Sequence, residues 1–184
     1  MDHYTDISIL PDSEFPATVL MNAIYSKFHK ALCELSSAGI GISFPEYKTT
    51  LGTVLRIHSQ EAVLNDLQGL NWIGGMSGYC NVSGVLAVPV DTKFRIISRK
   101  QPTMSQSKLN RLIKRGHISE DNLKLYKIKM LSRELDKPYV ELISGSTGQK
   151  YRRYIEFGEL LDQPVKGEFD QFGLSKTATV PWFD

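Results

Sequence analysis

The spacing of apolar side chains along the first ninety residues predicts alternating strands and helices. Apolar residues occupy alternate positions over 3–10, as in a half-buried strand, and recur every three or four positions over 20–35, as in a helix that packs on a core. This half then continues with strands expected at 40–44, 53–58 and 82–90 and a second helix at 61–70. The resulting order, β-α-β-β-α-β, is that of a ferredoxin-like unit.

The first helix carries a candidate for acid–base chemistry. Ser13 is expected to cap this helix, and Pro16 to lie in its first turn. His29 lies about 100° around the helix from the apolar stripe, where a side chain is shielded from water yet reachable. Such a histidine suits a general base, although a histidine that merely completes the packing is the more frequent case. The stripe itself consists of Leu20, Ile24, Phe28, Ala31, Leu32 and Leu35.

The second half has a different pattern, with a basic helix and a β-hairpin. Its predicted helix at 105–116 places four cations on one face and three apolar residues on the other. The cations are Lys108, Arg111, Lys114 and Arg115, and the apolar residues are Leu109, Leu112 and Ile113. Around this helix we expect strands at 94–98, 138–143 and 151–157 and a helix at 119–132. The whole chain is therefore predicted to be an α+β protein, with an N-terminal ferredoxin-like βαββαβ domain at 1–92 and a smaller C-terminal α+β domain at 93–184.

The hairpin turn, Ser144-Gly145-Ser146-Thr147-Gly148, consists of small and hydroxylated residues. Hydroxyls and exposed backbone N–H groups at a Gly-rich turn form an anion-binding site. Ser and Gly are also the ordinary residues of a hairpin turn, so this pattern alone leaves both interpretations open.

Charge is distributed unevenly between the two halves. Residues 1–92 contain four Lys and Arg against nine Asp and Glu, a net charge of −5, whereas residues 93–184 contain eighteen against eleven, a net charge of +7. The stretch from Lys93 to Arg115 carries eight cations and no carboxylate. A concentrated positive face favours a polyphosphate partner through counterion release, and a solvated basic helix is the alternative.

Composition excludes several classes of protein. The hydrophobic fraction of 41% and charged fraction of 23% are typical of soluble globular proteins. No apolar run approaches the ~20 residues that span a bilayer, and the polar N-terminus is unlike a secretory signal. Cys33 and Cys80 form neither a disulfide framework nor a metal-ligand pattern, and Cys33 is expected to be a core thiol. We therefore expect a cytoplasmic protein without metal, cofactor or membrane partner.

Several short motifs follow one another in a specific order along the chain. They are Met1-Asp2-His3-Tyr4, Glu14-Phe15-Pro16, His29, Ile40-Gly41-Ile42-Ser43-Phe44-Pro45, Leu55-Arg56-Ile57-His58, Ser98-Arg99 with Gln101, Ser146-Thr147-Gly148-Gln149 and Gly173-Leu174-Ser175-Lys176. This ordered set resembles the CRISPR-associated endoribonucleases of type I-F systems, the Csy-type members of the CRISPR repeat-processing endoribonuclease family. The resemblance extends from one end of the chain to the other.

The resemblance implies a metal-independent endoribonuclease that cuts the stem-loop of CRISPR repeat RNA just 3′ of the stem. His29 would be the base that takes the proton of the attacking ribose 2′-hydroxyl, giving a 2′,3′-cyclic phosphate and a 5′-hydroxyl. Ser144 would position the attacking nucleotide. Family members usually carry a tyrosine where this chain has Phe172. We therefore expect Phe172 to orient His29 by packing alone, at a modest loss of rate.

The resemblance also assigns residues to RNA binding. Arg99 and Gln101 would read a guanine and an adenine edge at the foot of the stem. Tyr151 would stack on the last base pair, although a strand residue in the core is the alternative. The phosphate-binding residues would be Lys108, Arg111, Lys114 and Arg115 along the stem and Ser146 and Thr147 at the cut, and Arg152 and Arg153 would continue the basic surface.

Three functional hypotheses remain open at this point. In the first, the protein cuts the repeat RNA and then stays on the crRNA hairpin, with other subunits of a type I-F interference complex as partners. In the second, it is a non-catalytic structural subunit that only caps the hairpin. In the third, it is a general RNA-binding module, for which surface aromatics on the central strands would be expected, and none is convincing in this sequence.

Overall fold

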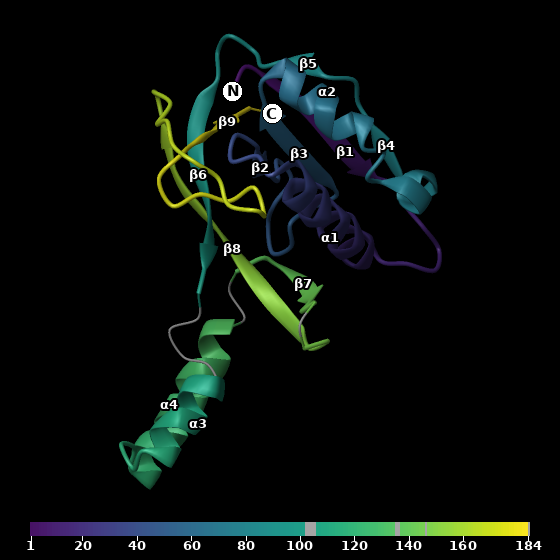
Figure 1. Cartoon of the computed structure of the whole chain (residues 1–184). Helices are drawn as coiled ribbons and strands as arrows, with labels where there is room; N and C mark the ends of the chain where they lie inside the picture. Colours follow the sequence, from purple (N-terminus) through teal and green to yellow (C-terminus); the bar gives the residue numbers. More distant parts are fainter. Residues whose placement is uncertain (102–105, 135–136, 146, 184) are drawn as a thin grey trace.

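The chain forms a mixed α+β fold with two antiparallel sheets (Figure 1). The structure, a computed structural model, describes residues 1–101, 106–134, 137–145 and 147–183. Helix α1 contacts strand β1 of the first sheet and strand β7 of the second, so it links the two halves of the chain.

The first sheet is built from the N-terminal half and has the strand order β2-β3-β1-β4, with β5 also paired to β1. Its register places Ile7 opposite Leu55, both of which are fully buried. The elements are β1 (His3–Ile9), α1 (Ala17–Leu35), β2 (Gly41–Ser43), β3 (Val54–Ser59), α2 (Glu61–Gly69), a 3₁₀ helix η1 (Gly74–Tyr79), β4 (Cys80–Val82) and β5 (Leu86–Ala87).

Two details of this half differ from the sequence-based expectation. The strand expected at 82–90 is divided into β4 and β5 at Ser83, whose hydroxyl accepts a hydrogen bond from the Asp6 N–H at 2.9 Å. Helix α1 begins after Pro16, without a side-chain cap from Ser13. Asp12 instead organises the entry, because its carboxylate accepts the N–H groups of Glu14 and Phe15, each at 2.8 Å.

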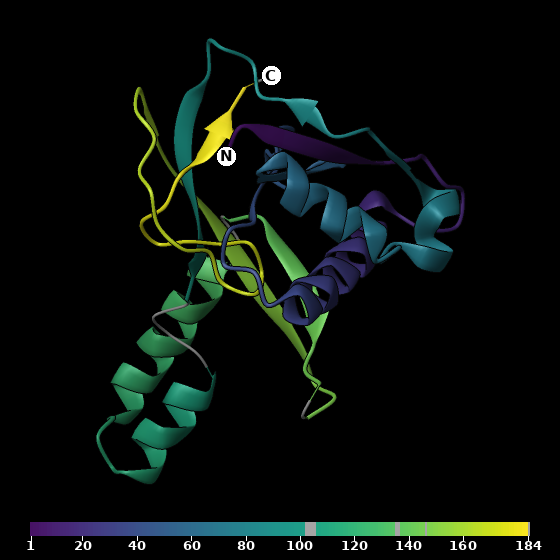
Figure 2. The same cartoon turned by 45° about the horizontal axis from the view of Figure 1, so that its top comes forward.

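The second sheet, with the order β7-β8-β6-β9, is built from the C-terminal half. Its longest strand, β8, pairs with β7 so that Arg153 lies opposite Val140. Helices α3 and α4 lie side by side and project away from both sheets (Figures 1 and 2). The elements are β6 (Lys93–Lys100), α3 (Gln106–Lys114), α4 (Glu120–Glu134), β7 (Tyr139–Ile143), β8 (Lys150–Leu161) and β9 (Val180–Trp182).

Helix α3 ends where its sequence predicted. Gly116 adopts a φ of +64°, which an L side chain rarely tolerates, and its N–H bonds the Ile113 carbonyl at 3.0 Å. The His117 N–H bonds the Leu112 carbonyl at 3.0 Å, which completes a Schellman motif. The apolar face is less covered than expected, because Leu109 is fully buried whereas Ile113 is 48% exposed.

One hydrophobic core includes residues of both sheets, among them Ile42 and Ile155, which are both fully buried. The segment between β8 and β9 crosses from one sheet to the other. Its Gly173 carbonyl accepts the Ile42 N–H at 3.1 Å, and its Ser175 N–H bonds the Ile97 carbonyl at 3.0 Å. A domain boundary at 92/93 would fall between β5 and β6, and it stays a prediction.

Arg56 joins the C-terminal segment to the first sheet. Its guanidinium donates to both carboxylate oxygens of Asp6, at 2.8 and 2.9 Å, and to the Phe183 carbonyl at 2.8 Å. The same group lies over the rings of Tyr4 and Phe183, at 4.8 and 4.1 Å from their centroids. A bidentate, stacked arginine of this kind is poorly replaced by lysine.

Candidate active site

His29 lies on α1, partly exposed, against the segment that crosses between the sheets. Its Nδ1 is 2.6 Å from the Gln171 carbonyl oxygen. A carbonyl oxygen can only accept a hydrogen bond, so Nδ1 must carry the proton in this contact. The neutral ring then presents the Nε2 lone pair, which is the arrangement that a general base requires.

The Phe172 ring stacks on the His29 imidazole. The ring centroids are 3.7 Å apart and the ring planes differ by 9°. The Tyr25 hydroxyl holds the backbone at this point by donating to the Phe172 carbonyl at 2.9 Å. Burial raises the pKa of the Tyr25 hydroxyl far above its ordinary value, which keeps it protonated and able to donate. The expected packing of Phe172 on His29 is therefore present.

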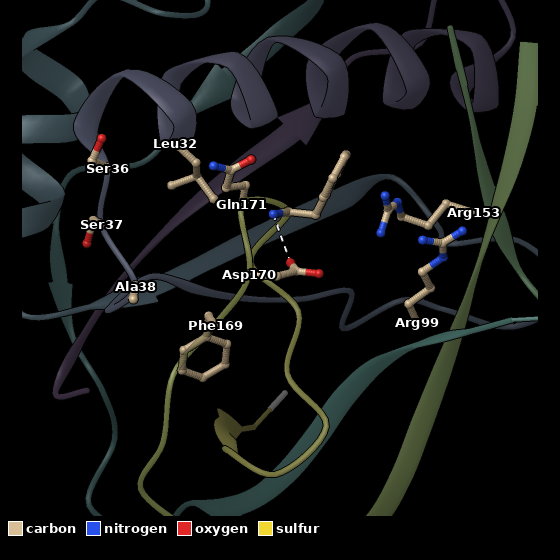
Figure 3. A pocket seen from close by; sticks show the side chains of 10 residues that line it. Leu32, Ser36, Ser37, Ala38, Arg99, Arg153, Phe169, Asp170 and Gln171 are labelled. Atoms are coloured by element: carbon tan, nitrogen blue, oxygen red, sulfur yellow. Dashed lines mark hydrogen bonds between the residues drawn. The ribbon is translucent and has the colours of Figure 1, made fainter. Parts of the chain in front are cut away.

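A tight turn at residues 170–174 positions Gln171 and Phe172. Oδ1 of Asp170 accepts the Phe172 N–H at 2.8 Å, drawn dashed in Figure 3, and the Leu174 N–H at 3.0 Å. Gly173 has a φ of +70°, and a Cβ added there would lie 2.9 Å from Cγ2 of Ile42. The turn thus needs glycine both for its backbone conformation and for its close contact with the core.

Arg153, expected on the basic surface, is instead buried. Only 5% of it is exposed, and its guanidinium carbon lies 3.4 Å from the Phe172 ring centroid. The sequence interpretation missed a sign of this burial. Arg153 is two residues before the buried Ile155 in β8, so both side chains lie on the same face of the strand. Gln171 was also missed, since it contributes a backbone carbonyl, which residue type does not reveal.

Two adjoining pockets open beside Arg153, and Phe172 lines the first of them. Figure 3 shows Arg99 and Arg153 next to each other, facing Asp170 across the first pocket. This pocket has a volume of about 520 Å³, and the second has about 660 Å³. Arg99, Arg153, Phe169 and Asp170 line both, and the second also includes Gln101, Ser175 and Lys176. Arg99 and Gln101, expected to act together, therefore line the same pocket.

Cys33 is exposed rather than a core thiol. It lies one turn after His29 on α1, and its sulfur is 3.7 Å from Nδ1 and 4.0 Å from Nε2 of the imidazole. The thiol also donates to Oε1 of Gln171 at 3.6 Å. Cys33 follows His29 by four residues, so it lies on the same face of α1, at the rim of the apolar stripe. This position explains why Cys33 is exposed.

The hairpin turn between β7 and β8 is ordered around Ser144. The Ser144 carbonyl accepts the Gly148 N–H at 2.8 Å, and its hydroxyl oxygen accepts the Thr147 N–H at 3.3 Å. Thr147 is exposed, whereas Ser146 lies outside the described residues. That Ser144 and His29 act on one ribose stays a prediction. Tyr151, at the start of β8, is partly buried and packs against the core, so its stacking role stays a prediction too.

The cations of the basic stretch divide into two groups. Lys108, Arg111, Lys114 and Arg115 are all exposed on α3, as expected. Three others lie on β6: Lys93 pairs with Asp162, Lys100 with Glu156, and Arg95 lies over the rings of Tyr47, Phe157 and Trp182. The exposed cations of this stretch therefore include the row at α3 and Arg99, which lines both pockets.

Within the described part of the chain, no three His, Cys, Asp or Glu side chains gather as metal ligands would. No helix in the described ranges is long and apolar enough to cross a bilayer.

Comparison with known proteins gives one consistent result. Residues 4–183 match the family model described as CRISPR-associated protein (Cas_Csy4). A protein of Escherichia coli (strain UTI89 / UPEC) named CRISPR-associated endonuclease Cas6/Csy4 is 38% identical over 184 residues, and the match covers 100% of both chains. A protein of the same name from Pseudomonas aeruginosa (strain UCBPP-PA14) is 38% identical over 187 residues, again with 100% of both chains covered.

Proposed function

This chain belongs to the Cas_Csy4 family of CRISPR-associated proteins, and on that premise we propose that it is an endoribonuclease that processes CRISPR repeat RNA. The substrate is the stem-loop of the repeat transcript, which the protein cuts just 3′ of the stem. The observation that carries this proposal is the imidazole of His29, whose Nδ1 is hydrogen-bonded to the Gln171 carbonyl and whose ring is stacked on Phe172.

The proposed reaction needs no metal ion. Nε2 of His29 takes the proton of the ribose 2′-hydroxyl, the 2′-oxygen attacks the adjacent phosphorus, and the bond to the 5′-oxygen breaks. The 5′-oxygen takes up a proton, so the products are a 2′,3′-cyclic phosphate and a 5′-hydroxyl. Alignment of an intramolecular nucleophile supplies ~7–11 kcal/mol of the barrier, and a positioned base adds roughly 10²–10⁴-fold. We assign the alignment to Ser144 and the base to His29.

Binding is assigned to the exposed cations and the pocket beside Phe172. Lys108, Arg111, Lys114 and Arg115 would follow the phosphates of the stem, because side chains cannot read the deep, narrow major groove of duplex RNA along its length. Arg99 and Gln101, which line one pocket, would read the base pairs at the foot of the stem. Thr147 and Ser146 would hold the backbone at the cut, and Tyr151 would stack on the last pair.

Three broader assignments complete the proposal. The strand order β2-β3-β1-β4 supports a ferredoxin-like N-terminal domain at 1–92, followed by an RNA-binding domain at 93–184. After cleavage the protein would stay on the 3′ hairpin of the crRNA as a subunit of a type I-F interference complex. Its place of action would be the cytoplasm.

Cleavage of a repeat hairpin in EDTA tests the reaction. The wild-type protein should cut once, 3′ of the stem, and leave a 2′,3′-cyclic phosphate. His29→Ala should bind the hairpin within about twofold of wild type but cut at least ~10²-fold more slowly. The control is His3→Ala, which removes a histidine from the start of β1 and should cut at the wild-type rate.

Two results would contradict the proposal. Cleavage by His29→Ala at the wild-type rate would show that the base is another group. Tight binding of the hairpin by the wild-type protein without any cut would favour the alternative, a structural subunit that only caps the hairpin.

A further inference from the structure

A buried arginine lies against the ring that supports the proposed base. The Arg153 guanidinium carbon is 3.4 Å from the Phe172 ring centroid, and the His29 ring centroid is 3.7 Å from it with nearly parallel planes. Two groups at these distances cannot share one face of a ring. The three side chains therefore form a stack, with Phe172 in the middle and the guanidinium and imidazole on opposite faces.

The burial of Arg153 is unfavourable for stability. Its Nε is inaccessible to water and has no hydrogen-bond partner among the described residues, and no carboxylate in that part of the chain forms an ion pair with it. A buried N–H donor without a partner destabilises a fold, although the guanidinium as a whole lines the two pockets. The face of an aromatic ring compensates only in part. A methionine of similar length would fill the space without this cost, so packing alone does not explain an arginine here.

The Phe172 ring is only partly buried against the core, and the Tyr25 ring, with its centroid 6.3 Å away, contacts it less closely than the imidazole and the guanidinium do. The turn holds its backbone N–H and carbonyl through Asp170 and Tyr25, but a phenylalanine ring has no polar atom of its own. The pocket of about 520 Å³ on the Arg153 side gives the ring space to tilt if the guanidinium is removed. His29 would then keep its hydrogen bond to the Gln171 carbonyl but lose the surface that sets its orientation.

We propose that Arg153 is a positioning residue, which holds the plane of the Phe172 ring and through it the imidazole of His29. The inference rests on the proposed function, since it is the cleavage reaction that needs the imidazole in one orientation. Misplacement of a catalytic group by about 1 Å can cost ~10²-fold in rate, so a residue that never touches the RNA can still control the chemistry.

Arg153→Met is the central variant, because it removes the charge and keeps a long side chain. Its single-turnover cleavage at saturating protein should be ~10–100-fold slower than wild type. Its dissociation constant for a hairpin with a 2′-deoxy residue at the cut should stay within twofold, and its melting temperature should be unchanged or higher. Arg153→Lys, which keeps the charge without the planar group, should lie between the two.

A double-mutant cycle tests whether Arg153 acts through the ring. Phe172→Leu removes the ring, and in that background Arg153→Met should change the cleavage rate less than twofold. Arg95→Met is the matched control, because it removes another stacked arginine, one that packs on the rings of Tyr47 and Trp182 rather than on Phe172. It should lower the melting temperature and leave saturated cleavage within twofold of wild type.

Reactivity of His29 provides a readout that does not depend on cleavage. Carbethoxylation by diethyl pyrocarbonate, followed by peptide mass spectrometry, should modify His29 several-fold faster in Arg153→Met than in wild type. This result would support the stack even if the wild-type protein cut no RNA, so failure of the proposed function is distinguishable from failure of this inference.

Three outcomes would overturn the inference. Hairpin affinity that falls in proportion to the rate would make Arg153 an RNA contact. A melting temperature that falls together with the rate would make its role structural. An equal loss of rate in the Phe172→Leu background would show that it does not act through the ring.

Discussion

At the scale of single residues, neighbouring groups decide what each side chain of the candidate site can do. His29 is partly exposed, and a backbone carbonyl selects which of its nitrogens carries the proton. Phe172 has no polar atom, yet its ring is enclosed by an imidazole and a guanidinium. The sequence shows the residue types, whereas the tautomer and the stack depend on chain segments that are far apart in sequence.

Phe172→Tyr tests how much the missing hydroxyl matters. Nδ1 of His29 already has an acceptor in the Gln171 carbonyl, so a phenol can only refine the orientation of the ring. We expect single-turnover cleavage to rise by less than about tenfold, with hairpin affinity unchanged. Phe172→Leu is the control that removes the ring, and it should slow cleavage. A gain of a hundredfold or more would mean that packing alone leaves the site impaired.

Gly173→Ala should disturb the turn that carries Gln171 and Phe172. The alanine would have to adopt a φ of +70°, and its Cβ would lie 2.9 Å from Cγ2 of Ile42. We expect a loss of about 1–3 kcal/mol in the free energy of unfolding, measured by urea denaturation, and slower cleavage.

Gly116→Ala is the matched control for that experiment. Gly116 has a similar φ of +64°, but nothing lies within 4 Å of an added Cβ. It should therefore show the backbone strain alone, about 1 kcal/mol, without an effect on cleavage at saturating protein. Equal losses of stability in the two variants would show that the contact with Ile42 is unimportant.

At the scale of elements, helix α3 has a regular end and an exposed row of cations. Arg115→Ala should weaken hairpin binding and reduce the slope of log affinity against log salt by about 1, because one fewer counterion is released. Titrations by filter binding at several salt concentrations measure both quantities. Lys48→Ala removes one charge from the loop between β2 and β3 and should leave the slope unchanged. The same slope in Arg115→Ala and wild type would remove Arg115 from the RNA-binding surface.

Elements with a long, regular pattern were predictable, and their exceptions have local causes. The period of the apolar stripe in α1 and the glycine after α3 were sufficient to place both helices. The division of the strand expected at 82–90 could not be predicted, because it depends on a hydrogen bond from the Asp6 N–H to the Ser83 hydroxyl, and these residues are remote in sequence. Within the site, the rim position of His29 was readable. The buried position of Arg153 was not predicted, because a charged side chain was assumed to be exposed.

At the scale of the whole molecule, the two sheets share one hydrophobic core, and several polar side chains are also buried. Arg56 and His58 are examples, two residues apart and therefore on the same face of β3. Each of the three side-chain nitrogens of Arg56 donates a hydrogen bond, two to Asp6 and one to Phe183. His58 has one hydrogen-bond partner, because Nε2 lies 2.8 Å from the Ser43 hydroxyl while Nδ1 is buried with no partner in the described part of the chain. Such a group makes stability depend on pH.

His58 should make the folded state less stable in mild acid. Burial, with the nearby Arg56 charge adding to it, holds the pKa of His58 well below its ordinary value of 6.5. Below pH 6.5 the unfolded chain therefore binds a proton that the folded chain does not, so the free energy of unfolding falls as pH falls. The slope approaches about 1.4 kcal/mol per pH unit, and urea denaturation between pH 7.5 and 5 measures it.

His58→Gln isolates this contribution, because the slope rather than the absolute stability is compared. The variant is expected to be less stable at neutral pH but to lose most of the pH dependence between 6.5 and 5. Glu46 and Glu156 do not interfere in that range, since hydrogen bonds from Thr53 to Glu46 and from Lys137 to Glu156 hold the pKa of both groups below their ordinary value of 4.5. Their stabilising contribution is lost only at lower pH. A slope retained in full by His58→Gln would assign the acid sensitivity to another group.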